Sequence, residues 1–380
     1  MDRFSTFPVA GRTVGTVVKA SRERPEGGAC RVGRIGSLLG SRSRIRTRGW
    51  LCLAWAAPVL AGLAVATPAH ALVITPVFDS SVTGNGNAAA IEGAIDSALG
   101  TIDGLYANPV SISVDFTYTA AADGNLLSTA QNFYAVSYGT YVNALSLDAS
   151  ANPQNTVLAT ALAHLSQGND ASGANELAIT GAQAAMLGLG PSLLSNATIN
   201  INSNQNFAFA RPVSSGQYDL IGGLEHELDE VLGGGGAGST LNSIAGSCGT
   251  DPTGFFCSKY GALDLYRYSS ADTPSFTTSP GATAYFSVDG GTTSIVGFNQ
   301  NSAGDYADFS PAGTGAGQLI QNAFNSTGQD EPYTTNSPEF LMQEAIGWDA
   351  VPEPSSLALL LSSVIGMLGL YERRKRPRTS

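Results

Sequence analysis

The sequence predicts an α+β fold, in which a twisted mixed sheet backed by helices precedes an irregular C-terminal lobe. Two observations favour this class. Segments with the two-residue period of a strand and segments with the 3.6-residue period of a helix alternate up to residue 232. After the glycine run at residues 233–236 the chain changes to short strands and turns. We therefore divide the globular part into an N-terminal lobe, residues 72–233, and a C-terminal lobe, residues 234–350.

The expected elements follow from these two periods. Apolar residues of segment 88–106 fall on one helical face, and segment 110–118 (VSISVDFTY) alternates as a half-buried strand does. In the C-terminal lobe, segment 284–299 is expected to form a hairpin that turns at residues 289–291, and segment 339–349 a short helix. The other strands are expected at residues 73–78, 176–180, 197–202 and 207–211, and the other helices at residues 133–147, 156–165 and 181–189.

Residues 219–236 (DLIGGLEHELDEVLGGGG) form the stretch with the clearest chemistry. Four apolar residues recur at spacings of three and four, which predicts a helix with one buried stripe that the glycine run ends. His226 and Glu230 lie one turn apart on a nearly opposite face, with Glu227 beside them. Metallopeptidases hold zinc and a general base in this way in the motif H-E-x-x-H. Here Glu230 replaces the second histidine, and glutamate is itself a zinc ligand.

The charge of this helix supports the same interpretation. Glu225, Glu227, Asp229 and Glu230 fall within six positions, and no lysine or arginine lies between residues 219 and 236. Like charges three or four residues apart destabilise a helix by a few tenths of a kcal/mol per pair. A bound divalent cation would offset this repulsion. The alternative is a solvated acidic helix with a surface histidine.

The charge of the globular part excludes one class of partner. Residues 72–371 contain three basic residues and 26 acidic ones, a net charge of −23. Such a surface repels nucleic acid and anionic membranes, so we expect no nucleic-acid partner. It could collect Ca²⁺, which is the alternative cofactor.

Residues 1–71 are expected to be a leader and signal peptide rather than part of the fold. Eleven of the 19 basic residues lie there, followed by an apolar run at residues 50–66 and by Ala69, His70 and Ala71. These are the parts of a secretory signal, with cleavage after Ala71. The basic region before the apolar run is long, which points to a mis-assigned start codon.

Residues 351–380 read as a membrane-directed tail. Pro352, Glu353 and Pro354 precede an apolar run at residues 357–371, and five basic residues follow it. An ordinary single-pass anchor would look similar. The whole pattern resembles the PEP-CTERM sorting signal of Gram-negative bacteria. The resemblance implies recognition by an exosortase during export, often together with exopolysaccharide production. It also implies transient anchoring through the tail and a final place at the cell envelope, the outer surface or outside the cell.

The globular part has two cysteines, Cys248 and Cys257, just after the central helix. A pair in an exported protein most simply forms a disulfide, which would staple the loop beside the proposed site. Two thiols that bind a metal are the weaker alternative.

The globular part also resembles a family of zincin-like metalloproteases that carry PEP-CTERM signals. The similarity rests on the segments HELDEVLG, LDLYRYS, YFSVDGG, GDYADFS and AIGWD. It implies that His226 and Glu230 bind one catalytic zinc ion and that Glu227 is the general base of an endopeptidase. The chain departs from the metzincin pattern at Gly236, where a third ligand would stand. A third protein ligand must therefore come from elsewhere.

Asp264 is the preferred third ligand, because some zincins place that ligand beyond the helix after an insertion. A structural aspartate paired with Arg267 is the alternative. Tyr266, Arg267 and Tyr268 are candidates to line the cleft, where the tyrosines could stabilise an oxyanion.

Other residues receive less specific expectations. His164 is expected to be an exposed helix residue, and Asp305 and Asp308 are expected to form a turn rather than a calcium site. The function predicted is peptide-bond hydrolysis by a zinc-activated water. The alternatives are an inactive zincin-fold protein of the exopolysaccharide matrix and an acidic surface protein that binds Ca²⁺.

Overall fold

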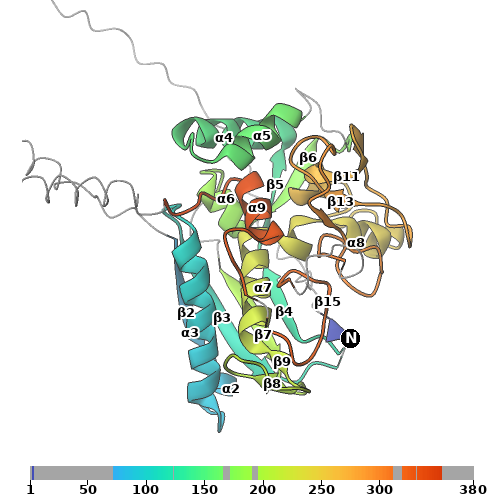
Figure 1. The fold of residues 1–380 in the computed structure, drawn as a ribbon. Coiled ribbons are helices and arrows are strands. Elements are labelled where there is room, and N and C mark those ends of the chain that lie inside the picture. The colour runs from blue at the N-terminus through green and yellow to red at the C-terminus, as the bar shows by residue number, and fades with distance from the viewer. Residues whose placement is uncertain are drawn as a thin grey trace, which may run out of the picture. The chain divides into compact units, whose positions relative to one another are not determined.

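The fold was obtained as a computed structural model, which describes residues 2–3, 72–122, 124–165, 172–190, 196–310, 319–330 and 332–352. These residues form a mixed α+β structure with several sheets (Figure 1). The apolar runs of the expected signal peptide and sorting tail lie outside the described residues. Among the residues described, no helix has the length and apolar character needed to span a membrane.

A four-stranded mixed sheet supports the central helix, in the order β2-β3-β7-β4. The strands β2 (Val73–Phe78), β3 (Ser111–Thr119) and β7 (Ala197–Asn202) are parallel. They confirm three strands expected from the sequence to within one residue at either end. The fourth strand, β4 (Leu127–Gln131), runs antiparallel to β7 and forms one edge. No strand was expected from the sequence at residues 127–131.

Two helices pack on this sheet and on each other. These are α3 (Ala88–Leu105), which contacts β2, and α7 (Leu220–Leu232), which contacts β4 (Figure 1). The apolar face expected for α3 is buried. Fully burying one such side chain stabilises the fold by about 1.5–3 kcal/mol. Helix α7 ends at Gly233, whose φ of 104° lies in the left-handed region that glycine adopts readily, so the expected glycine stop is confirmed.

The burial of α7 differs from the sequence expectation of one buried stripe. All 13 of its residues are buried, including its histidine and its four acidic residues. One side of the helix faces α3 and the sheet. The other side meets segments far along the chain, because His226 contacts Ile320 and Asp229 contacts Tyr333. The alternative of a solvated acidic helix with a surface histidine is therefore wrong.

A second sheet, in the order β10-β6-β5, packs against helices α4 and α6, and α5 packs on α4. Segment 133–147 was expected to be helical throughout, but its first part is the strand β5 (Phe133–Ser137). Ser137 then caps α4 (Tyr138–Ala151) by accepting a hydrogen bond from the Thr140 amide, and this cap sets the helix start. The other members of this region are β6 (Glu176–Thr180), β10 (Tyr260–Gly261), α5 (Thr156–His164) and α6 (Gly181–Met186).

The C-terminal region is built from short elements. Strands β13 (Tyr285–Phe286) and β14 (Val296–Gly297) form the expected hairpin, and β11 (Arg267–Ser270) extends it. The expected terminal helix is α9 (Pro338–Ala345). The remaining elements are β1 (Asp2–Arg3), β8 (Phe207–Ala208), β9 (Tyr218–Asp219), β12 (Thr273–Pro274), β15 (Phe324–Asn325), α2 (Ser80–Thr83), α8 (Leu241–Ala245) and the 3-10 helices η2 (Gly235–Gly238), η3 (Ser247–Gly249) and η4 (Leu263–Tyr266).

Two further features bear on the site. Cys248 and Cys257 are joined by a disulfide with a Cα–Cα distance of 5.3 Å, which confirms that expectation and leaves neither thiol free to bind a metal. One hydrophobic cluster contains residues from both sides of the proposed lobe boundary at residue 233, among them Leu99, Phe286 and Trp348.

Candidate metal centre

His226 is fixed by a hydrogen bond to a backbone carbonyl. Its Nδ1 lies 2.7 Å from the carbonyl oxygen of Ile320, which can only accept a hydrogen bond. In the neutral imidazole, Nδ1 therefore carries the proton and Nε2 carries the lone pair. Metal-binding histidines are commonly oriented by such a hydrogen bond from the ring nitrogen that does not bind the metal.

Two carboxylates converge on His226 Nε2. Glu230 Oε1 lies 3.7 Å from it and Asp308 Oδ2 lies 3.8 Å from it. The three ligand atoms lie within 4.8 Å of one another, and the side chains are 0 % exposed. Tetrahedral zinc with ligands at about 2.0–2.1 Å would place such atoms roughly 3.3–3.4 Å apart. His226, Glu230 and Asp308 thus form a buried group that could hold a metal ion.

The hydrogen bonding of this group fits a cation. Within the described part of the chain, Glu230 Oε1, Glu230 Oε2 and Asp308 Oδ2 are buried without a hydrogen bond of ordinary geometry. The Gly236 amide is close enough to lower the pKa of Glu230, but burial has the larger effect and raises this pKa well above its ordinary value. Buried carboxylate oxygens normally have donors, so these three fit the ligands of a metal ion.

Position 236, where metzincins have their third ligand, has no room for a side chain. A Cβ at this position would lie 2.7 Å from Glu230 Oε1 and 2.7 Å from Asp305 Cβ. The loop that contains Asp305 and Asp308 therefore occupies the space that a side chain at position 236 would need. The expected turn is present at residues 306–307, but Asp308 also points into the metal group.

Glu227 lies beside this group. Its Oε2 accepts a hydrogen bond from Thr129 of the edge strand β4, whereas its Oε1 has no hydrogen-bond partner among the described residues. Burial raises the pKa of Glu227 well above its ordinary value, and the negative charge of Glu230 raises it further. The positive field of a bound cation would act in the opposite direction.

The other acidic residues of α7 have partners of their own. Glu225 Oε2 accepts from Arg211 Nη2 at 2.9 Å, and Asp229 Oδ1 accepts from Tyr333 Oη at 2.6 Å. Both residues are buried, and neither belongs to the group around His226.

Asp264 does not join the metal group. Its Oδ1 accepts from Ser239 Oγ at 2.7 Å, and its Oδ2 accepts from the amides of Thr240 and Gly261 at 3.2 and 2.8 Å. These donors tie η2 and its following turn to β10, which is a structural role. Among the described residues, Asp308 rather than Asp264 completes the group that could hold a metal ion. Arg267 is near enough for its charge to lower the pKa of Asp264, although burial raises that pKa by more.

The three cleft candidates lie inside the C-terminal region. Tyr266 Oη donates to the Ala345 carbonyl at 2.9 Å, and Arg267 Nη1 donates to the Tyr306 carbonyl at 2.6 Å. Tyr266, Arg267 and Tyr268 are all buried, and the two cavities described below are lined by other residues. Their proposed role as cleft residues that stabilise an oxyanion stays a prediction. His164 is exposed at the end of α5, as expected.

A cavity of about 230 Å³ lies next to the metal group. Thr129, which holds Glu227, and Gly236, which contacts Glu230, are among its lining residues. Phe133 and Phe256 supply aromatic surface, and the described lining contains no charged side chain. The full lining is Thr129, Gln131, Phe133, Gly236, Ala237, Ser239, Asn242, Ser243, Ser247 and Phe256.

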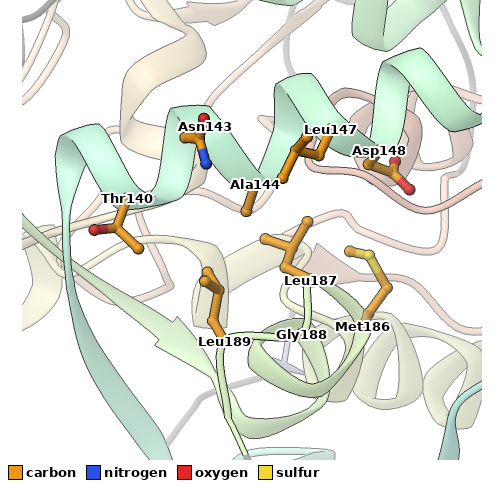
Figure 2. A pocket seen from close by; sticks show the side chains of 9 residues that line it. All are labelled: Thr140, Asn143, Ala144, Leu147, Asp148, Met186, Leu187, Gly188 and Leu189. Carbon is orange, nitrogen blue, oxygen red and sulfur yellow. The ribbon is translucent and has the colours of Figure 1, made fainter. Parts of the chain in front are cut away.

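A larger cavity of about 410 Å³ lies between α4 and the turn after α6. Figure 2 shows Leu187 and Leu189 pointing toward α4, with Asp148 at one end. Asp148 is the one charged residue of its described lining. This cavity brings together neither a base with a nucleophile nor a set of metal ligands within the described part of the chain, so the smaller cavity is the better candidate for a functional site.

Comparisons of the chain with protein families, with curated proteins and with solved structures find no match. The chain is an α+β protein whose central helix supplies two of three buried residues that could hold a metal ion.

Proposed function

We propose that the chain is an exported zinc-dependent endopeptidase with a zincin-like α+β fold. The convergence of His226, Glu230 and Asp308 beside Glu227 carries this proposal. The mixed sheet with an antiparallel edge strand, packed against α3 and α7, is consistent with a zincin-like lobe.

The donor set favours zinc over calcium. Imidazole and carboxylate are common zinc ligands, and three protein ligands are typical of a catalytic zinc site. Calcium prefers six to eight oxygen ligands. One nitrogen and two carboxylates fit the first description better. Calcium bound elsewhere on the acidic surface is the alternative.

The proposed chemistry divides between the ion and Glu227. Bound zinc would polarise a peptide carbonyl and lower the pKa of a water molecule. Glu227 Oε1 is the oxygen left free to accept the proton of that water, because Thr129 holds Oε2. The same oxygen would return the proton to the leaving amine. Ile320 keeps His226 Nε2 directed at the two carboxylates throughout.

The surroundings of the site suit a peptide substrate. Strand β4 is an edge of its sheet, and Thr129 and Gln131 of this strand line the adjacent cavity. An extended peptide can add to such an edge through main-chain hydrogen bonds, with pockets that receive alternate side chains. The uncharged lining with Phe133 and Phe256 would accept an apolar side chain.

The variant Glu227→Gln tests the assignment of the base. We expect stoichiometric zinc to remain and casein digestion to be lost, because the amide cannot accept the proton. Glu225→Gln is the matched control: it is the same substitution on the same helix, and Glu225 pairs with Arg211 outside the metal group. It should retain activity. Digestion of casein by Glu227→Gln at the wild-type rate would show that Glu227 is not the base.

The complete burial of the three proposed ligands favours a second candidate, an inactive protein with a closed structural metal site. Such a protein could belong to an exopolysaccharide matrix. Metal analysis together with proteolysis distinguishes the candidates. Zinc with chelator-sensitive activity supports the peptidase, zinc without activity supports the structural site, and calcium alone supports an acidic calcium-binding surface protein.

Export through a PEP-CTERM signal is part of the proposal. The signal-like leader, the tail pattern and the Cys248–Cys257 disulfide support it, because disulfides persist in oxidising compartments. The partners would be an exosortase that recognises the tail and a protein or peptide substrate. Before processing, the tail would anchor the chain in the inner membrane, with its globular part at the cell envelope.

A further inference from the structure

A buried glutamine lies against the proposed ligands. Gln321 is 0 % exposed, and its Nε2 lies 3.2 Å from His226 Nε2 and 3.0 Å from Asp308 Oδ1. Its Oε1 is also buried and has no hydrogen-bond partner among the described residues. The sequence offers no local signal for this residue, because it lies 95 positions from His226.

The direction of this amide follows from its neighbours. His226 Nδ1 donates to the Ile320 carbonyl, so Nε2 presents a lone pair, and Asp308 presents a carboxylate oxygen. Both neighbours need a donor or a cation, and without an ion the amide N–H groups supply the donors. The reverse orientation would set Oε1 against two acceptors. It becomes favourable only when a cation stands between them.

Gly235 makes room for this amide. A Cβ at this position would lie 1.9 Å from Gln321 Nε2, and the φ of Gly235 is +47°, in the left-handed region. The backbone of η2 is thus shaped around the glutamine. This contact is independent of the hydrogen bonds to His226 and Asp308.

We propose that Gln321 is the fourth protein group of the metal centre and that its amide reverses when the ion binds. Without metal, its N–H groups occupy the lone pairs of His226 and Asp308. With metal, Oε1 faces the ion and completes a donor set of one nitrogen and three oxygens. Zinc can accept a fifth ligand, so a water molecule can still bind. This inference rests on the proposed metal site, but not on catalytic activity.

Two substitutions separate the two orientations. Gln321→Met keeps the length but removes both donor and acceptor. We expect it to lower the melting temperature of the metal-free protein and to weaken zinc binding at least tenfold. Gln321→Glu keeps an oxygen for the ion but loses the N–H donors. It should also destabilise the metal-free protein, yet bind zinc at least as tightly as the wild type.

Thermal unfolding of each chelator-treated variant gives the melting temperature of the metal-free protein. Zinc affinity is measured on separate samples of the folded full-length protein by competition with a chromophoric chelator. Gln343→Met is the matched control, because Gln343 is a buried glutamine that donates to the Asp229 carbonyl instead. It should lower the melting temperature and change zinc affinity less than twofold.

Three outcomes would overturn the inference. In the first, both Gln321 variants bind zinc as the wild type does. In the second, both lose affinity equally, which would indicate a role in packing alone. In the third, the wild type binds no zinc, and this result alone would also remove the proposed metal centre.

Discussion

Replacing Asp308 and Asp264 in parallel discriminates between the ligand that the structure indicates and the ligand that the sequence predicted. Asp308→Asn keeps the shape of the side chain and an oxygen that can accept from Gln321, but it removes the charge. Asp264→Asn makes the same change at a residue that accepts hydrogen bonds from Ser239 and two amides. Both sites are fully buried, so the two variants are closely matched.

The two variants should change stability in opposite directions when no metal is present. The ligand atoms of Asp308 and Glu230 lie within 4.8 Å, so two ionised carboxylates there would repel by about 3.5 kcal/mol at an effective dielectric constant of 20. Burial raises both pKa values and reduces the ionised fraction. Asp308→Asn should therefore stabilise the metal-free protein by about 1–3 kcal/mol. Asp264→Asn should destabilise it by about 1–2 kcal/mol, because charged acceptors are lost.

Excess zinc should offset the stabilisation of Asp308→Asn and leave the destabilisation of Asp264→Asn unchanged. Removing a ligand should weaken zinc binding by about 100-fold or more, since even residues that only support ligands contribute 10–100-fold. A 100-fold loss of affinity corresponds to about 2.7 kcal/mol of zinc-dependent stabilisation. Urea unfolding of the disulfide-intact protein with chelator measures the metal-free stability, and unfolding with excess zinc measures the zinc-dependent stabilisation. Loss of the zinc effect in Asp264→Asn, with retention in Asp308→Asn, would show that the structural assignment of the ligand is wrong.

Two further substitutions test the surroundings of the site and the rest of the fold. Gly236→Ala should destabilise the protein and weaken zinc binding, because its Cβ would lie 2.7 Å from Glu230 Oε1; Gly249→Ala, whose Cβ meets no described atom within 4 Å, should change neither. Burial raises the pKa of Asp148 from 3.8 to about 6, so the folded wild type loses stability as pH rises from about 4 to 6. Asp148→Asn has no carboxyl group to ionise at this position. Its free energy of unfolding relative to that of the wild type should therefore rise from pH 4 to pH 6, as measured by urea titrations. A difference that stays constant with pH would contradict the raised pKa.

Local sequence patterns predicted the elements with a strong period of their own. The apolar stripe of α3, the glycine stop of α7 and the hairpin of β13 and β14 depend on residues close together in the chain. Their caps, turns and periodicity are visible without knowledge of the tertiary contacts. The 3.6-residue period of the helix likewise predicted that His226 and Glu230 lie one turn apart, and both belong to the group that could hold a metal ion.

The elements that were missed depend on distant contacts. Strand β4 (LSTAQ) has little apolar alternation, and its pairing with β7, about 70 residues later, makes it a strand. Asp308 lies 78 positions after Glu230 in sequence, so no spacing rule relates the two. One signal for it existed, because Asp308 lies within GDYADFS, one of the segments on which the family resemblance rests. Asp264 was preferred because some zincins place the third ligand beyond the helix. In the structure, Asp264 Oδ2 instead accepts hydrogen bonds from the backbone amides of Thr240 and Gly261.

The acidic residues of α7 divide into two kinds, and this division is the strongest physical argument for a cation. A buried carboxylate is costly unless a charge or hydrogen-bond donors compensate it. Glu225 Oε2 and Asp229 Oδ1 have such partners in Arg211 and Tyr333, and neither residue belongs to the group around His226.

Glu230 differs from those two residues. Neither of its carboxylate oxygens has a hydrogen bond of ordinary geometry within the described residues. The same holds for Asp308 Oδ2, which lies 3.8 Å from His226 Nε2. Other buried carboxylate oxygens of the described residues, such as Glu225 Oε1 and Asp229 Oδ2, also lack a hydrogen bond. Glu230 Oε1 and Asp308 Oδ2, however, both lie within 4 Å of His226 Nε2, the ring nitrogen opposite the one that binds the Ile320 carbonyl. A proton could neutralise one carboxylate at a time, whereas a divalent cation compensates all of these atoms together, which is why the geometry favours a metal ion over a set of protonated acids.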